Sequence, residues 1–150
     1  MGDLQKIDTD ELLKLLFMES NLEHFMNKDM TDSLLPSFSD YVTELCQSSG
    51  ETPGKVIAGS NLDKSFGYQL FSGKRNPSRD SVIQLAFGFG ADYDLAQQLL
   101  KIGRKSLLHP KVKRDVVIIF SLQHKYSVTE ANLLLDEYSL PLLGEGNRHE

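Results

Sequence analysis

Residues 52–80, TPGKVIAGSNLDKSFGYQLFSGKRNPSRD, decide the fold of this chain. Thr52, followed by a proline, is a favourable N-cap for a short helix. Asn61 tolerates the left-handed dihedrals that a sharp turn requires. Asp63 can cap a second helix, which Gly73 ends. The stretch therefore predicts a short helix, a tight turn, a second helix and a basic loop.

Apolar residues at helical spacing predict further helices on both sides of this stretch. In residues 38–46 they recur at i, i+3, i+4, i+7 and i+8, which gives one buried face. Downstream, Ser78 and Asp92 can cap two helices, the first shortened by Gly88 and Gly90. The side chains expected in the core are Phe38, Tyr41, Val42, Leu45, Cys46, Val56, Ile57, Leu70, Phe71, Val82, Ile83, Leu85, Ala86, Phe89, Leu95, Ala96, Leu99, Leu100 and Ile102.

The charge of the chain is unevenly distributed. The net charge of −5 over 150 residues would by itself argue against a polyanionic partner. Residues 1–51 carry −8 and residues 115–150 carry −4, whereas residues 52–114 carry +7. A concentrated cationic region is therefore expected in spite of the acidic isoelectric point.

An internal repeat with an offset of 35 residues follows the opening stretch. Residues 79–108 align with residues 114–143 without a gap, and nine of the 30 positions are identical. Ser127 and Glu130 form a capping-box pattern in the second copy. Two copies of one helical hairpin are the economical interpretation, and chance similarity between amphipathic helices is the alternative.

The composition argues against several classes of protein. No apolar run reaches the roughly 18–20 residues needed to cross a bilayer, and residues 1–13 lack the pattern of a signal peptide. The single cysteine, Cys46, favours a reducing cytoplasm and a buried structural thiol. The four histidines have no metal-ligand spacing, and no nucleotide-binding or catalytic motif occurs. We expect no enzyme, no metal and no cofactor.

The spacing of apolar and capping residues in 38–100, together with Gly73-Lys74-Arg75-Asn76-Pro77-Ser78, resembles the lambda-repressor-like helix-turn-helix fold of XRE (Cro/C1-type) transcriptional regulators. The resemblance covers about 60 residues. It implies an all-α fold with a five-helix DNA-binding domain over 36–103. Outside the resemblance, we expect an acidic helical extension over 1–35 and a helical hairpin over 104–143 that packs on this domain. Residues 144–150 are expected to be a disordered tail.

The sequence departs from the family pattern at three positions. Ile57 stands where the family usually has a small alanine, and Gly67 where it has a branched apolar residue. Since these positions face each other in the family, Ile57 is expected to fill the space that Gly67 leaves. Pro53 replaces a glutamine that often contacts phosphate.

The resemblance implies a sequence-specific double-stranded DNA-binding regulator of bacterial or phage type that reads the major groove with helix 63–72. Its base-contacting side chains would be Lys64, Ser65, Tyr68 and Gln69. Its phosphate-contacting residues would be Thr52, Lys55, Ser72, Lys74, Arg75, Asn76 and Arg79. Gln and Lys have the hydrogen-bonding groups that match adenine and guanine edges. The alternative for these polar residues is an ordinary solvated face.

A second basic group lies in the linker before the second copy of the repeat. It consists of Lys101, Arg104, Lys105, Lys111, Lys113 and Arg114. These residues would contact flanking phosphates, or would form a solvated linker or a surface that pairs with the acidic residues 1–51 of the same or a neighbouring chain. The flanking hairpins are candidates for a homodimer contact or for a protein partner, and the expected location is the cytoplasm, with the nucleoid. The alternative functions are a protein-interaction adaptor and an antitoxin built on the same scaffold.

Overall fold

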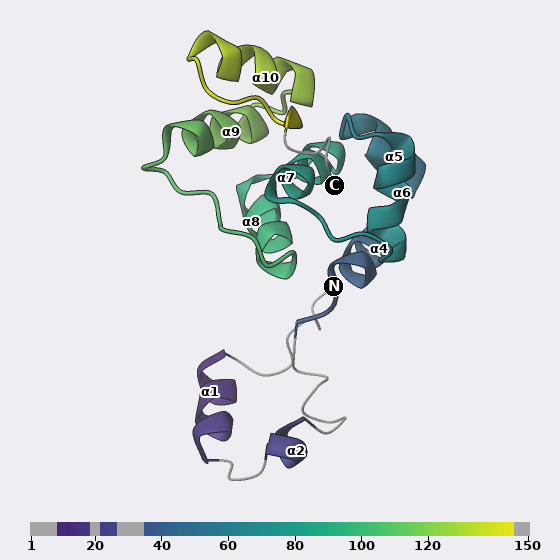
Figure 1. Ribbon diagram of the computed structural model, residues 1–150, viewed down its shortest axis with the longest axis vertical. Helices are drawn as coiled ribbons and strands as arrows, with labels where there is room; N and C mark the ends of the chain where they lie inside the picture. Colours follow the sequence, from purple (N-terminus) through teal and green to yellow (C-terminus); the bar gives the residue numbers. More distant parts are fainter. Residues whose placement is uncertain (1–8, 19–21, 27–34, 146–150) are drawn as a thin grey trace. The chain divides into compact units, whose positions relative to one another are not determined.

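A computed structural model describes residues 9–18, 22–26 and 35–145 of the chain (Figure 1). It divides into an N-terminal unit, residues 1–36, and a C-terminal unit, residues 37–150, which are described separately. Much of the predicted extension over 1–35 and most of the predicted tail over 144–150 lie outside the described residues.

The N-terminal unit contains two short helices, α1 (Thr9–Met18) and α2 (Leu22–Phe25). Two acidic residues in the first turn of α1, Asp10 and Glu11, suit the positive end of the helix dipole. None of the residues of α1 is buried. The helical character predicted for this extension is therefore present in its described part.

The C-terminal unit is built from seven helices in its described residues. In chain order they are α4 (Phe38–Ser49), α5 (Pro53–Gly59), α6 (Lys64–Ser72), α7 (Arg79–Gly88), α8 (Tyr93–Ile102), α9 (Lys113–Gln123) and α10 (Val128–Glu137). Figure 1 shows α7 and α8 between α4–α6 on one side and α9–α10 on the other. The described residues contain no strand, and the all-α class is confirmed for them. No helix within these ranges is long and apolar enough to cross a bilayer.

The predicted helix starts and stops are confirmed. Side-chain oxygens of the N-cap residues accept hydrogen bonds from backbone N–H groups at the starts of α4, α5, α6, α7, α8 and α10. Ser127 and Glu130 form the predicted capping box. Gly50 and Gly73 end α4 and α6 in the left-handed region, and Asn61 adopts a φ of 57° between α5 and α6.

Most of the predicted core is buried, with a few corrections. Leu45, Phe89 and Leu95 are half-buried rather than buried, because they lie at the edges of their helices. Cys46 is buried as expected; burial, and to a smaller extent Glu51, raises the pKa of its thiol. The buried Asp115 was not expected.

Glycine allows α5 and α7 to approach each other closely. A Cβ atom at Gly88 would collide with Oγ of Ser60 and with the carbonyl oxygen of Val56. As expected, α7 ends at Gly88, and Gly90 follows with a φ of 66°. The physical role of Gly88 is the close contact between α5 and α7.

The hydrogen bonds of the structure show the 35-residue repeat. The amide side chain of Gln97 accepts from N of Leu108 (2.8 Å) and donates to its O (3.0 Å). Asn132 makes the same two bonds to Leu143, at 2.7 and 3.2 Å. Two pairs of equivalent residues adopt positive φ, Gly90/Lys125 and Arg104/Ser139. We call residues 79–108 the first hairpin and residues 114–143 the second hairpin.

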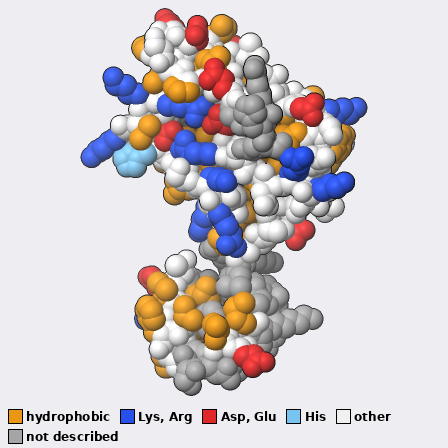
Figure 2. Space-filling model, viewed as in Figure 1, with side chains coloured by type: hydrophobic (Ala, Val, Ile, Leu, Met, Phe, Trp, Pro, Cys, Tyr) orange, Lys and Arg blue, Asp and Glu red, His pale blue; other side chains and the backbone are white. Residues whose placement is uncertain are grey.

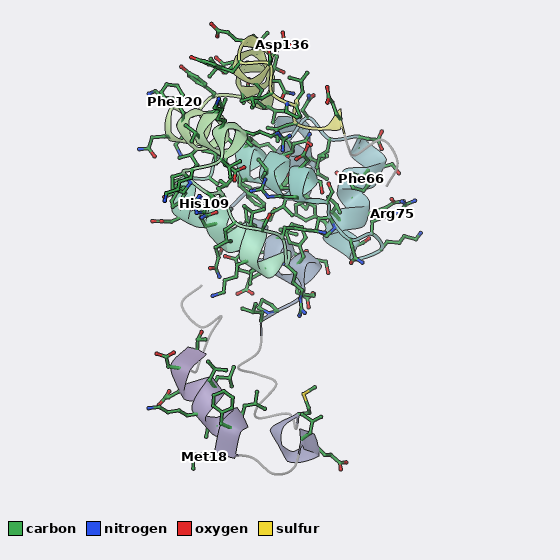
Figure 3. All side chains as sticks on the ribbon, turned by 60° about the vertical axis from the view of Figure 1, so that its left-hand side comes forward. Met18, Phe66, Arg75, His109, Phe120 and Asp136 are labelled. Carbon is green, nitrogen blue, oxygen red and sulfur yellow. The ribbon has the colours of Figure 1, made fainter. Side chains whose placement is uncertain are left out.

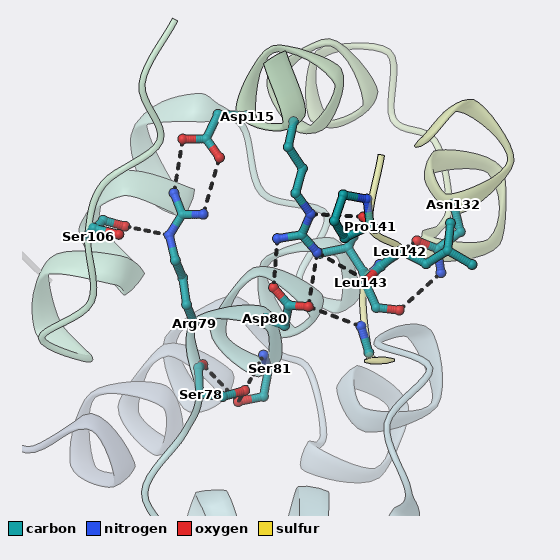
Figure 4. Close-up of polar contacts among 12 residues, drawn as sticks. Ser78, Arg79, Asp80, Ser81, Ser106, Asp115, Asn132, Pro141, Leu142 and Leu143 are labelled. Carbon is teal, nitrogen blue, oxygen red and sulfur yellow. Dashed lines mark hydrogen bonds and ion pairs between the residues drawn. The ribbon is translucent and has the colours of Figure 1, made fainter. Parts of the chain in front are cut away.

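Two ion pairs join the hairpins reciprocally (Figure 4). Arg79 donates from both Nη atoms to the two carboxylate oxygens of Asp115, each at 3.1 Å. Arg114 donates to Asp80 in the same way, each at 3.0 Å. Since Arg79 is equivalent to Arg114 and Asp80 to Asp115, the exchange is that of a two-fold symmetric contact.

Each of these arginines also binds the end of its own hairpin. The accepting carbonyls are those of Ser106 and Leu107 for Arg79, and those of Pro141 and Leu142 for Arg114. Four of the five guanidinium N–H donors of each arginine are therefore used within the protein. Arg114 therefore does not belong to the second basic group predicted from the sequence, because its guanidinium is bound within the protein.

The hairpins also meet at the other end of α7 and α9. Nζ of Lys125 donates to the carbonyl of Gly90 at 2.9 Å. A cavity of about 60 Å³ beside this bond is lined by three pairs of equivalent residues, Phe87/Leu122, Gly90/Lys125 and Ala91/Tyr126. Because α7 and α9 are joined at their starts and at their ends, they run in the same direction.

Candidate nucleic-acid interface

The α5–α6 pair presents one buried and one exposed side. Gly67, Leu70 and Phe71 of α6 are buried against the rest of the unit. On the same helix, Lys64, Ser65 and Tyr68 are exposed. The spacing of the buried residues along α6 determines which side faces out, so the exposed side follows from the local sequence.

The four predicted base-contacting residues lie together. They line a shallow surface depression of about 700 Å³, whose lining residues are Asp63, Lys64, Ser65, Tyr68, Gln69, Ser72 and Lys74. Two residues predicted to contact phosphate, Ser72 and Lys74, thus border the same surface. The carboxylate of Asp63 also borders it, and its Oδ2 accepts the cap hydrogen bond from N of Phe66 at 3.0 Å.

The side chain of Tyr68 lies next to Gly54 at the start of α5. A Cβ atom at Gly54 would lie 2.8 Å from the Tyr68 hydroxyl oxygen, so a larger residue at this position would require the Tyr68 side chain to move. The tyrosine keeps 44% of its surface exposed. Gly54 was not recognised from the sequence, although a glycine in the first turn of a helix was a usable signal.

The predicted packing of Ile57 against Gly67 is present. A Cβ atom at Gly67 would lie 2.5 Å from Cγ2 and 2.8 Å from Cγ1 of Ile57. Both residues are buried. The larger side chain on α5 therefore fills the space above the glycine on α6, and this contact sets the distance between the two helices.

The remaining phosphate candidates form a cationic border around α6. Lys74, Arg75 and Asn76 are exposed in the loop after α6, where Arg75 projects away from the protein (Figure 3). At the start of α5, Thr52 is exposed and its Oγ1 accepts from N of Lys55. Figure 2 shows Lys and Arg side chains beside α6, and another group beside the segment between α8 and α9.

Lys55 forms an exposed ion pair with Glu51 at 3.6 Å. Such a pair is worth about 0–1 kcal/mol, so the lysine can leave it for a stronger anion at little cost.

Arg79 does not belong to this border. Its guanidinium is half-buried and bound to Asp115 and to two backbone carbonyls. We therefore correct the predicted set of phosphate contacts by removing Arg79. The identical Arg-Asp pair in both copies of the repeat was the sequence signal for this structural role.

A buried glutamine ties the turn between α5 and α6 to the first hairpin. Nε2 of Gln84 on α7 donates to the carbonyls of Ser60 (3.1 Å) and Asn61 (3.4 Å). Buried polar groups of this kind fix a backbone position because losing the bond is costly. Gln84 stands in an otherwise apolar run, which was the signal that sequence reasoning missed.

In the described part of the chain, no group of three or more His, Cys, Asp or Glu side chains could hold a metal ion. The side chains that line the surface on α6 include hydrogen-bonding and cationic groups. Comparison of the chain with family models, with curated proteins and with solved structures gives no match.

Proposed function

We propose that the chain is a sequence-specific regulator of transcription that binds double-stranded DNA with α6 in the major groove. The observation that carries the proposal is the depression on α6, which gathers Lys64, Ser65, Tyr68 and Gln69 on one exposed face. A helix with a polar face and cations beside it fits a groove that displays hydrogen-bonding base edges between two rows of phosphates.

The order and caps of α4–α8 support a lambda-repressor-like arrangement, with α5 and α6 as the helix-turn-helix. In that arrangement the border residues Thr52, Lys55, Ser72, Lys74, Arg75 and Asn76 contact phosphates. Their role is to orient α6, whereas the side chains of α6 distinguish base pairs. A protein with this role acts in the cytoplasm, at the nucleoid.

The test uses the full chain and a randomised duplex library at low salt, followed by binding of the selected sequence and its single-base variants. Gln69→Ala is expected to lose about 1–3 kcal/mol of discrimination at one base pair. Arg75→Ala is expected to weaken binding to all sequences alike and to reduce its salt dependence.

Two exposed residues outside the interface serve as controls, Gln47→Ala on α4 and Lys14→Ala on α1. Both are expected to bind DNA as the unchanged protein does. The proposal fails if neither Gln69→Ala nor Arg75→Ala changes DNA retention.

A second candidate function is a protein-interaction adaptor or an antitoxin on the same scaffold. One observation favours it: exposed apolar side chains on α9 and α10, including Val116, Phe120 and Tyr138. An adaptor or antitoxin would copurify with a different protein in fixed stoichiometry, and purification of the chain without one counts against this candidate.

A further inference from the structure

An apolar groove of about 600 Å³ lies between α9 and α10. Its lining residues are Lys113, Val116, Val117, Phe120, Leu134, Tyr138 and Leu140. Val116 and Phe120 are each 46% exposed and Tyr138 is 66% exposed. Figure 3 shows Phe120 on the outer side of α9. Contiguous exposed apolar surface of this kind marks a contact site.

The repeat shows what kind of element covers such a face. Seven residues lie 35 positions before those that line the groove; the first directly precedes the first hairpin and the others belong to it. They are Ser78, Ser81, Val82, Leu85, Leu99, Gly103 and Lys105. Most of them are buried, and a Cβ atom at Gly103 would lie 3.4 Å from the Phe38 ring of α4. In the first hairpin this face is thus covered by an amphipathic helix.

The uncovered face is also the more apolar of the two. Where the buried face has Ser81, Gly103 and Lys105, the exposed face has valine, tyrosine and leucine. Solvation alone favours the opposite distribution, because exposed apolar area has a free-energy cost.

The Phe120 ring is held in place by stacking on His124, with ring centroids 4.0 Å apart. An aromatic side chain that is already ordered loses little conformational entropy when a partner binds.

Charges of opposite sign border the two sides of one end of the groove. Lys113 lines the groove at the start of α9, and Glu137 ends α10 next to the lining residue Tyr138; both charged residues are exposed. They share an end because Arg114 binds the carbonyls of Pro141 and Leu142, which follow α10. A two-fold axis along the groove brings the α9 side of one copy onto the α10 side of another. Lys113 of each copy then faces Glu137 of the other.

We propose that a second copy of this chain occupies the groove, so that α9 and α10 of two copies pack as a two-fold symmetric four-helix arrangement. Apolar complementarity at the centre and opposite charges at the rim are the features of a self-complementary contact. The inference goes beyond the proposed function and does not rest on it. If both hold, the dimer presents two copies of α6 to two half-sites on DNA.

The first test measures the mass of the full chain over a range of concentrations by sedimentation equilibrium. The unchanged protein is expected to be a dimer. The double variant Val116→Ser/Tyr138→Ala is expected to raise the dissociation constant roughly 30-fold or more, because aromatic residues at the centre of a contact dominate its affinity. Leu133→Ala is the control, since this residue is 67% exposed but does not line the groove.

The second test uses charge reversal and is independent of folding defects. Lys113→Glu and Glu137→Lys should each weaken the dimer roughly three- to thirtyfold, since each dimer contains the pair twice. The double variant Lys113→Glu/Glu137→Lys should restore it. A residue with only a structural role would not give this rescue.

A chain that stays monomeric at every accessible concentration overturns the inference. The inference is also overturned if the Val116→Ser/Tyr138→Ala substitutions do not weaken the dimer. It fails as well if the purified protein is a monomer and its groove binds a helix of another protein. Gln69→Ala and Arg75→Ala should leave the dimer unchanged. If the protein is a dimer that does not bind DNA, the proposed function fails and this inference stands. If it is a monomer that binds DNA, this inference fails and the proposed function stands.

Discussion

The first and second hairpins have the same internal hydrogen bonds but different surroundings. Arg79 and Arg114 make the same four bonds, and Gln97 and Asn132 hold equivalent backbone segments. The first hairpin is covered by α4–α6, whereas the second exposes its equivalent face. The polar bonds thus define the hairpin as a unit, and the apolar faces determine what each copy packs against.

The largest expected loss of stability comes from breaking the two ion pairs between the hairpins, whose aspartates differ in burial. The Asp115 side chain is 4% exposed and that of Asp80 is 17% exposed. Asp115→Ala leaves a half-buried arginine without its partner and should cost about 3–5 kcal/mol of unfolding free energy. Asp80→Ala should cost less, about 1–3 kcal/mol. Urea denaturation of both variants measures the two losses of stability. If Asp115→Ala costs no more than Asp80→Ala, burial does not determine the loss.

A second experiment concerns α5 and α6, two of the helices that cover the first hairpin. Ile57→Ala should cost about 2–5 kcal/mol, since it empties the space beside Gly67. Gly67→Ala alone should cost about 1–3 kcal/mol, because its Cβ meets Ile57. In the double variant the added methyl group enters the emptied space, and the combined loss should be smaller than the sum. A loss below about 1 kcal/mol for Ile57→Ala would refute this packing.

The contact between α5 and α7 gives a matched pair of substitutions. Gly88→Ala should cost about 1–3 kcal/mol, because the new methyl group meets Ser60 and the backbone of Val56. Its equivalent in the second hairpin is the exposed Gln123, and Gln123→Ala should change stability by no more than about 0.5 kcal/mol. Thermal unfolding of both variants measures the difference, and similar midpoints would show that α5 does not need the glycine.

A last pair of variants exchanges one residue between the two faces, and the effect at the exposed face is expected to be small. Val116→Ser should change the stability of the monomer by no more than about 0.5 kcal/mol, measured at high dilution. The reverse exchange, Ser81→Val, should cost about 1–3 kcal/mol, because Ser81 is fully buried and its Oγ donates to the Ser78 carbonyl. Equal effects at the two positions would mean that both faces are covered in the monomer.

Local features of the fold were predictable from the sequence. N-caps such as Asp63, the turn at Asn61 and the stop at Gly73 depend on neighbouring residues, and all three are present. The exposed side of α6 follows from the same local signals. The contact of Ile57 with Gly67 was also predictable, because both residues depart from the family pattern at facing positions.

Contacts between distant parts of the chain were not predictable in the same way. Arg79 was expected to bind phosphate, because nothing near it in the sequence reveals a partner 36 residues away. Gln84 was not expected to hold the turn between α5 and α6 for the same reason. The flanking hairpins were named as candidates for a contact, but the residues of the exposed face on α9 and α10 were not predicted, since an apolar run does not show whether another helix covers it.

The reciprocal ion pairs have a consequence for how the protein opens. In a linear repeat protein the terminal repeat can unfold while its neighbours stay folded. Here Arg79 and Asp80 are adjacent in the chain, and each is bound to the second hairpin. Opening the second hairpin therefore breaks the ion pairs of two charged side chains of α7 at once. The last 30 residues of the repeat are expected to exchange their amide hydrogens together with those of α7, as one cooperative unit.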